Sequence, residues 1–123
     1  MAARHGIEFI PSVGPGYIDT QVRPWNGQTT QPRAAGRYYD RMWARALDAR
    51  AAVVSVTSYN EWGEGTQIEE ARPHTAAGTG VVYADYGPNS TDAYMQLTRR
   101  LVDETQAKCA AAKPRPPVLK PEL

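Results

Sequence analysis

Residues 52–66, AVVSVTSYNEWGEGT, join a run of small and branched apolar side chains directly to two carboxylates, Glu61 and Glu64. The apolar part, 52–59, is nearly continuous, which is typical of a strand that is buried on both faces in a parallel sheet. Parallel α/β folds bind their ligands at the carboxyl ends of the strands. The two carboxylates therefore stand where such a fold is expected to have its functional site.

A strand, a loop and a helix precede this segment. Residues 7–13, IEFIPSV, predict a short strand, and residues 14–32, rich in Gly, Pro and polar side chains, predict a long loop of the kind that is usually functional. Residues 33–50 carry apolar side chains at spacings of three and four, which predicts an amphipathic helix whose arginines face water. The apolar face of this helix consists of Tyr39, Met42, Trp43, Ala46 and Leu47. Strand, loop, helix and strand form a βαβ unit with parallel strands.

The C-terminal part predicts irregular chain, one helix and a tail. In the irregular stretch, VVYADY (81–86) is expected to pair briefly, and residues 91–108 predict a helix. The apolar face of this helix consists of Tyr94, Leu97, Leu101 and Val102. The Pro-rich tail, 109–123, is expected to be disordered or extended. Two parallel strands leave both sheet edges open and cover only one face, so the sequence predicts the last part of a larger α/β fold.

Composition excludes several classes of function. The chain of 123 residues has a formal net charge of +1, which gives no electrostatic case for binding nucleic acid or an anionic membrane. A single cysteine, Cys109, excludes an internal disulfide and a cysteine metal site, and no metal or other cofactor is expected. No apolar run approaches the roughly 20 residues of a membrane span. Taken as complete, a chain without a signal sequence would be cytosolic.

The loops after the two strands would be neighbours on one rim of a barrel. Their polar and aromatic side chains are Tyr17, Asp19, Arg23, Trp25, Asn26, Tyr59, Asn60, Glu61, Trp62 and Glu64. Aromatic rings pack on the apolar C–H face of a sugar, amide and guanidinium groups bind its hydroxyls, and carboxylates supply an acid and a base. The combination indicates a pyranose-binding site.

The spacing of Glu61 and Glu64 fits such a site only if the chain bends. On an extended strand the two side chains point to opposite faces, whereas in a turn they lie about 5–6 Å apart. Gly63 and Gly65 make a bend easy because glycine tolerates positive φ. Carboxyl groups about 5–5.5 Å apart suit a retaining glycosidase. By spacing alone, a solvated acidic turn or a helix cap is the commoner structure.

Other residues have structural interpretations. Trp43 lies on the helix face and is predicted to be a core residue. Trp62 is equally well a core residue or a sugar-binding one. Glu69 and Glu70 are predicted to form a solvated acidic turn.

Two motifs carry a family resemblance. FIPSVGPGYIDTQVRPWN (9–26), followed by SVTSYNEWGEGTQIEEA (55–71), resembles the C-terminal portion of the endo-α-1,2-mannosidases of glycoside hydrolase family 99. The resemblance covers nearly all of residues 7–105. It implies an α/β fold, a partial (β/α)₈ TIM barrel in which residues 1–108 supply the last two βα units, strands seven and eight with their helices.

The resemblance also implies an activity and its residues. The family cleaves within α-mannosyl chains of glycoprotein N-glycans in the animal Golgi, or of bacterial mannans, so the expected partner is an α-mannoside oligosaccharide or glycoprotein glycan. Glu61 matches the base that engages the sugar 2-hydroxyl and helps form a 1,2-anhydro sugar, and Glu64 matches the general acid/base. Tyr17 and Arg23 match loop positions that face the substrate. The other expected substrate-binding residues are Trp25, Asn26, Tyr59, Asn60 and Trp62.

Length and one substitution qualify the resemblance. Animal members have His where this chain has Gly63, which could widen a subsite. A complete barrel needs about 250 residues, so this chain by itself is expected to be inactive and unstable. Two alternatives stay open: a non-catalytic carbohydrate-binding fragment, and a polysaccharide-assembly protein, in which NEWGEG also occurs.

Overall fold

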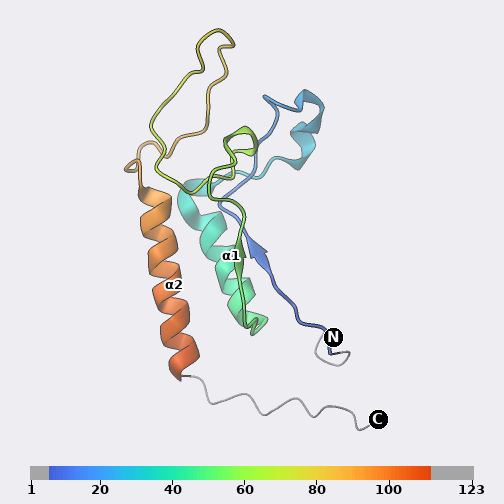
Figure 1. Ribbon diagram of the computed structural model, residues 1–123, viewed down its shortest axis with the longest axis vertical. Helices are drawn as coiled ribbons and strands as arrows, with labels where there is room; N and C mark the ends of the chain where they lie inside the picture. Colours follow the sequence, from blue (N-terminus) through green and yellow to red (C-terminus); the bar gives the residue numbers. More distant parts are fainter. Residues whose placement is uncertain (1–5, 112–123) are drawn as a thin grey trace.

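The computed structural model describes residues 6–111, in which two short strands alternate with two helices (Figure 1). Short 3₁₀ turns lie between them. In chain order the elements are β1 (Ser12–Val13), η2 (Pro24–Thr29), η3 (Ala34–Gly36), α1 (Arg37–Asp48), β2 (Ser55–Val56), η4 (Trp62–Glu64) and α2 (Ala93–Ala111).

The strands β1 and β2 pair in parallel, which confirms the predicted βαβ unit. Ser12 lies opposite Ser55 and Val13 opposite Val56. The backbone N–H of Thr57 donates to the carbonyl of Val13 at 2.8 Å. Both strands run toward one end of the molecule, and both helices run back from that end (Figure 1). The loops that follow the strands therefore gather at this end.

The strands are shorter and more exposed than the sequence predicts. The prediction that residues 52–59 are buried on both faces is wrong, because Val53 is 50% exposed and Ser55 is also exposed. Phe9, ahead of β1, is 54% exposed as well. The physical reason is that α1 covers one face of the strand pair, while residues 6–111 supply no layer for the other face.

Helix α1 begins at Arg37 rather than at residue 33. Ala34, Ala35 and Gly36 all have left-handed backbone, with φ of 51°, 53° and 89°, and this conformation cannot continue a right-handed helix. Gly36 also lies so close to α2 that a Cβ would be 2.9 Å from Leu97 Cδ2. The predicted apolar face is confirmed, with Tyr39, Trp43 and Ala46 buried and the arginines of the helix exposed.

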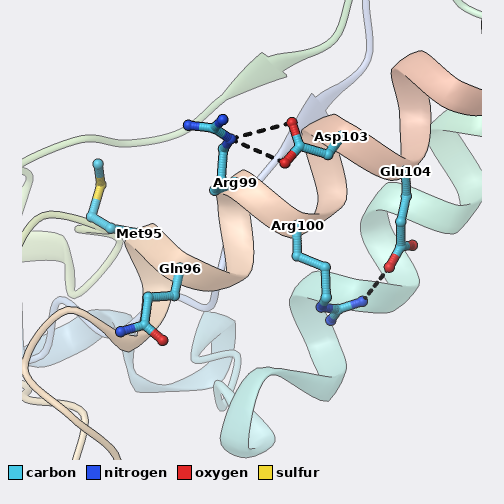
Figure 2. Close-up of a pocket in the computed structure, with 6 residues that line it drawn as sticks. All are labelled: Met95, Gln96, Arg99, Arg100, Asp103 and Glu104. Atoms are coloured by element: carbon cyan, nitrogen blue, oxygen red, sulfur yellow. Dashed lines mark hydrogen bonds and ion pairs between the residues drawn. The ribbon is translucent and has the colours of Figure 1, made fainter.

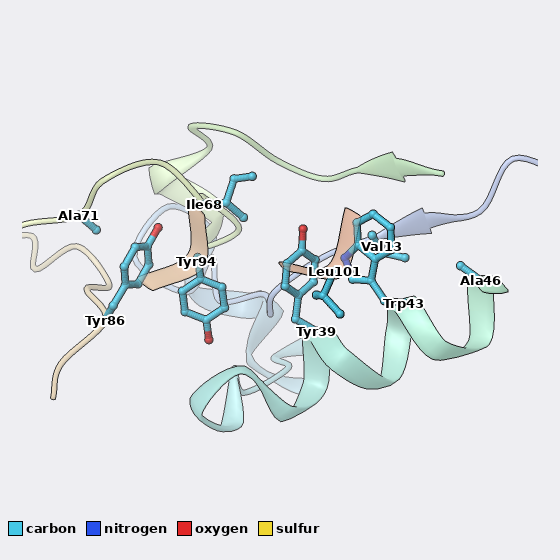
Figure 3. Packing of buried hydrophobic residues seen from close by; sticks show 9 residues of the cluster. All are labelled: Val13, Tyr39, Trp43, Ala46, Ile68, Ala71, Tyr86, Tyr94 and Leu101. Atoms are coloured by element: carbon cyan, nitrogen blue, oxygen red, sulfur yellow. The ribbon is translucent and has the colours of Figure 1, made fainter. Parts of the chain in front are cut away.

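The core is a row of aromatic rings between α1, α2 and the segment before α2 (Figure 3). Tyr39 contacts the edge of Trp43 at a centroid distance of 6.1 Å and lies 6.2 Å from Tyr94. Tyr94 in turn lies 4.7 Å from Tyr86. Val13 and Leu101 close the Trp43 end, so the predicted core role of Trp43 is confirmed (Figure 3).

Helix α2 and the segment before it agree with the sequence in outline. Tyr94 and Leu101 are buried, and Leu97 and Val102 are half-buried, as predicted for the apolar face. The helix ends at Ala111, three residues beyond the predicted boundary, and the rest of the predicted tail, 112–123, lies outside the described residues.

The brief pairing predicted for VVYADY (81–86) occurs as an antiparallel bridge between Val82 of this segment and Thr75. Within 6–111, no helix combines the length and the apolar character that a membrane crossing requires.

Replacing Trp43 with Ala is expected to lower the free energy of unfolding by about 3–5 kcal/mol, because the ring is almost completely buried. Urea unfolding of a protein that contains residues 6–111, followed by circular dichroism, measures the loss. The matched control is Trp25→Ala, where the ring is 81% exposed and the expected change is within about 0.5 kcal/mol. Equal losses for the two variants would contradict this core.

Candidate functional site

The loop after β1 closes on itself. Tyr17 and Gln31 form an antiparallel bridge, with backbone hydrogen bonds of 2.8 Å and 2.7 Å, and η2 lies in the enclosed segment. Gly16 permits this approach, because a Cβ there would be 2.9 Å from the carbonyl oxygen of Gln31. The predicted irregular loop is thus an ordered closed loop that presents a fixed set of side chains.

The loop after β2 bends as the sequence predicts. Residues 62–64 form the 3₁₀ turn η4, and Gly65 ends it with left-handed backbone, φ 59°. The N–H of Glu64 donates to the carbonyl of Glu61 at 3.3 Å. This geometry excludes the extended alternative, in which the two carboxylates would point to opposite faces. Gly65 supplies the positive φ, whereas Gly63 has ordinary backbone.

The two loops contact each other at Glu64. The N–H of Ile18 donates to the carbonyl of Glu64 at 2.8 Å, which joins the first loop to the second next to the carboxylate. The backbones lie so close that a Cβ on Gly65 would be 2.6 Å from Ile18 Cγ2. The expectation that these loops are neighbours on one rim is confirmed.

Asp19 is the centre of a polar cluster at this contact. Its side chain is completely buried and accepts hydrogen bonds from Tyr17 Oη at 2.8 Å and from Arg23 Nη1 at 2.9 Å. Asn26 Nδ2 donates to both Asp19 carboxylate oxygens, at 3.1 Å and 3.0 Å. Arg23 Nη1 also donates to Glu64 Oε1 at 3.1 Å, so the cluster ends on the Glu64 carboxylate.

The hydrogen bonds decide the ionisation of the cluster. Burial acts to raise the pKa of Asp19, but hydrogen bonds from Asn26, Arg23 and Tyr17 outweigh it and hold this pKa below its ordinary value. The hydrogen bond to Asp19 raises the pKa of Tyr17, which stays a neutral donor. Hydrogen bonds to Asp19 and then Glu64 raise the pKa of Arg23. Asp19 and Arg23 therefore form a buried anion beside a cation.

The structure brings together Tyr17, Arg23, Asn26 and Glu64 from the predicted site residues. Glu61 is exposed, and its carboxylate has no hydrogen-bond partner within residues 6–111. The remaining rim side chains are exposed and take no part in the polar cluster. They are Trp25, Tyr59 and Asn60.

Trp62 has a structural role at the edge of the core. It is half-buried against the core cluster, and its indole N–H donates to Glu69. Its ring meets the edge of Tyr83 at a centroid distance of 6.1 Å. Glu69 is half-buried and accepts the indole hydrogen bond, so it is less solvated than predicted. Glu70 is exposed, as predicted, and accepts from Arg72 and Thr91.

Arg33 binds the backbone that follows the turn of Glu61 and Glu64. No motif in the sequence indicates this role of Arg33. Its Nη2 donates to the carbonyls of Gly65 at 2.9 Å and Gln67 at 2.8 Å. Its guanidinium carbon lies 4.5 Å from the ring centroid of Tyr94 and 5.1 Å from that of Tyr86, in cation–π contact. Arg33 thereby connects the aromatic core to the backbone that follows Glu64.

A shallow hollow on the outer face of α2 is not a candidate site (Figure 2). Its charged side chains are paired with each other along the helix, Arg99 with Asp103 and Arg100 with Glu104. Among residues 6–111, no group of three or more His, Cys, Asp or Glu side chains could hold a metal ion. The rim at the carboxyl ends of β1 and β2 is the site that the geometry favours.

In this parallel βαβ unit, acidic, aromatic and arginine side chains gather at the carboxyl ends of the strands, which is where α/β enzymes have their active sites. Comparison with known proteins specifies the class. The family model for glycosyl hydrolase family 99 matches residues 1–107, and this chain belongs to that family. The resemblance predicted from the two motifs is confirmed.

Several relatives are about 50% identical to this chain over the aligned residues. It is 50% identical over 97 residues to glycoprotein endo-alpha-1,2-mannosidase of Mus musculus and 52% identical over 96 residues to that of Xenopus laevis. These matches cover 79% and 78% of this chain but only 21% of each relative. The chain thus spans about a fifth of the length of the curated relatives it matches.

A solved structure has the same arrangement. The GH99 endo-alpha-mannosidase of Bacteroides thetaiotaomicron superposes with a TM-score of 0.81 at 48% sequence identity, over 90% of this chain and 34% of that one. The fold of residues 6–111 is therefore that of one segment of a family 99 enzyme.

Gly65→Ala is expected to lower the free energy of unfolding by more than about 1 kcal/mol, because left-handed backbone costs an L-residue about 1–2 kcal/mol. The new Cβ would also lie 2.6 Å from Ile18 Cγ2. The matched control is Gly63→Ala, where the new Cβ would lie 3.3 Å from the end of the Val22 side chain and the expected loss is smaller. Urea unfolding compares the two variants, and a larger loss for Gly63→Ala would contradict the geometry of the turn.

Asp19 is expected to make stability depend on acid pH. Because folding lowers the pKa of Asp19, its stabilising contribution is complete above the ordinary value of 3.8 and is lost as the pH falls through the lowered pKa of the folded state. Below about pH 4, the melting temperature should therefore fall more steeply for wild type than for Asp19→Asn. Thermal unfolding from pH 7 to pH 2 measures both slopes, and parallel curves would count against an ionised Asp19.

Proposed function

We propose that this chain supplies the catalytic rim of a retaining endo-α-1,2-mannosidase, with Glu61 and Glu64 as the catalytic pair. The observation that carries the proposal is the turn at residues 61–65, which presents both carboxylates in a chain that belongs to a glycoside hydrolase family. The two carboxylates differ in surroundings: Glu61 is exposed and unpaired within residues 6–111, whereas Glu64 is held by Arg23. Different surroundings suit different roles.

In the proposed reaction, Glu61 accepts the proton of the sugar 2-hydroxyl while that oxygen attacks the anomeric carbon. Glu64 donates its proton to the leaving glycosidic oxygen as the C–O bond breaks, which gives a 1,2-anhydro sugar. Water then gives a proton to Glu64 and attacks the anomeric carbon, and the 2-oxygen recovers its proton from Glu61. Two inversions at one carbon give net retention.

The other rim residues bind the α-mannoside in this proposal. The fixed group that can bind sugar hydroxyls consists of Tyr17, Arg23 and Asn26. Both hydrogen bonds of Arg23, to Asp19 and to Glu64, use Nη1. Trp25 and Tyr59 are 81% and 57% exposed, so their rings are available to the C–H faces of sugars. Asn60 directly precedes Glu61, and Trp62 lies between the two carboxylates at the start of η4.

The same proposal makes residues 6–111 the last two βα units of a (β/α)₈ barrel. The exposed apolar side chains of the strand pair, such as Phe9 and Val53, support it, because neighbouring strands and the barrel interior would cover them. The substrate is then an α-mannoside oligosaccharide or glycoprotein glycan, and a eukaryotic parent would act in the Golgi. The chain by itself would lack the remaining strands and would not hydrolyse glycans.

A graft tests the proposal. Residues 7–105 replace the matching segment of the Bacteroides thetaiotaomicron enzyme, and hydrolysis of an α-1,2-mannoside is measured for this graft and for the chain alone. The graft is expected to be active and the chain inactive. Glu61→Gln and Glu64→Gln should each lower kcat about 10²- to 10⁴-fold without loss of folding.

The matched control in the graft is Glu70→Gln, because Glu70 is an exposed carboxylate outside the proposed pair. It should retain full activity. A folded graft that binds mannoside but does not cleave it would favour the non-catalytic alternative, which the exposed rings of Trp25 and Tyr59 also suit. Full activity of Glu64→Gln would overturn the assignment of the acid/base.

A further inference from the structure

The contact between Arg23 and Glu64 raises a difficulty for an acid catalyst. Arg23 Nη1 lies 3.1 Å from Glu64 Oε1, and a nearby cation favours the ionised form of a carboxyl group. A general acid must instead carry a proton when substrate binds. Left uncompensated, the charge of Arg23 would therefore oppose the role proposed for Glu64.

The structure provides compensation at the same guanidinium nitrogen. Arg23 Nη1 lies 2.9 Å from Asp19 Oδ2, slightly closer than to Glu64. The Asp19 side chain is completely buried, whereas Arg23 is 44% and Glu64 33% exposed. Hydrogen bonds from Tyr17 and Asn26 also hold the Asp19 carboxylate in position. Asp19 is thus the buried counter-ion of Arg23, and Glu64 is the partly exposed one.

We infer that Asp19 is a positioning residue whose buried carboxylate neutralises Arg23, so that Arg23 orients Glu64 without keeping Glu64 ionised. This inference rests on the proposed function, in which Glu64 is the acid/base. It gives Asp19 a task that is distinct from shaping the loop: it sets the charge that Glu64 experiences.

The charged and titratable groups around Glu64 define what a substitution would do. They are Arg23, Asp19 and Tyr17 from the loop after β1, and Glu61 from the turn itself. Asp19→Asn removes one negative charge and leaves the full charge of Arg23 to act on Glu64. This single change in charge favours the ionised form of Glu64.

The first experiment measures the titration of the Glu64 carboxyl group directly. Carbon-13 NMR of the labelled carboxyl groups follows the titration of Glu64 in the graft, with Glu64→Gln providing the assignment. Asp19→Asn should move the Glu64 titration toward acid, and Arg23→Gln should move it in the opposite direction. The control Asp103→Asn removes an exposed carboxylate on α2 and should leave the Glu64 titration unchanged. An unchanged Glu64 pKa in folded Asp19→Asn overturns the inference.

The second experiment separates acid supply from folding. A glycosidic substrate needs the Glu64 proton on its leaving oxygen, whereas an α-mannosyl fluoride loses fluoride without one, so its first step needs only Glu61. Asp19→Asn should lower kcat on the glycoside about tenfold at neutral pH, shift the basic limb of the pH profile about one unit toward acid, and spare the fluoride. Equal losses on both substrates with an unmoved profile would assign Asp19 a structural role only and overturn the inference.

The two proposals fail in different ways. A folded wild-type graft without hydrolysis would count against the proposed function, while the NMR titration would still decide whether Asp19 controls the charge at Glu64. An active graft whose Glu64 titration ignores Asp19→Asn would leave the proposed function standing and remove the inference.

Discussion

The parallel pairing of β1 with β2 is the constraint on which the rest of the chain depends. Two strands that run in the same direction end at the same edge, so the loops that leave Val13 and Val56 must meet there. Helix α1 makes the return crossing and covers one face of the pair through Trp43 and Ala46. Every contact between the two rim loops, including the hydrogen bond from Ile18 to Glu64, follows from that arrangement.

The side chain of Arg33 connects the aromatic core to the rim. Rings of Trp43, Tyr39, Tyr94 and Tyr86 form a row, and the Arg33 guanidinium lies over the last two. From there it donates to the backbone of Gly65 and Gln67, directly behind the turn that carries the two carboxylates. A guanidinium suits this position because it binds ring faces and carbonyl oxygens at the same time. The position of Glu64 therefore depends on core packing as well as on the turn.

The charged groups of the site form a row of three, Asp19, Arg23 and Glu64, rather than a single ion pair. Burial makes an isolated carboxylate costly, but Asp19 accepts hydrogen bonds from three neighbours and stays ionised beside Arg23. Arg23 then contacts the partly exposed Glu64, while Glu61 is exposed and its carboxylate has no hydrogen-bond partner among residues 6–111. One cation is shared between a buried anion and a partly exposed one, and this arrangement holds the Glu64 carboxylate in place.

The sequence by itself determined the βαβ order, the apolar faces of both helices, the bend at Glu61–Gly65 and the family. These features are encoded locally, because periodicity, glycine placement and long motifs need no knowledge of distant residues. Only the tertiary structure decided the late start of α1, the exposure of the strand pair, the indole hydrogen bond to Glu69 and the place of Arg33 beneath the turn. It also singled out Asp19 from the other polar residues of its loop. Each of these depends on which side chains from distant parts of the chain come within hydrogen-bond or packing distance, and that is fixed only when the two strands align and α2 packs against α1.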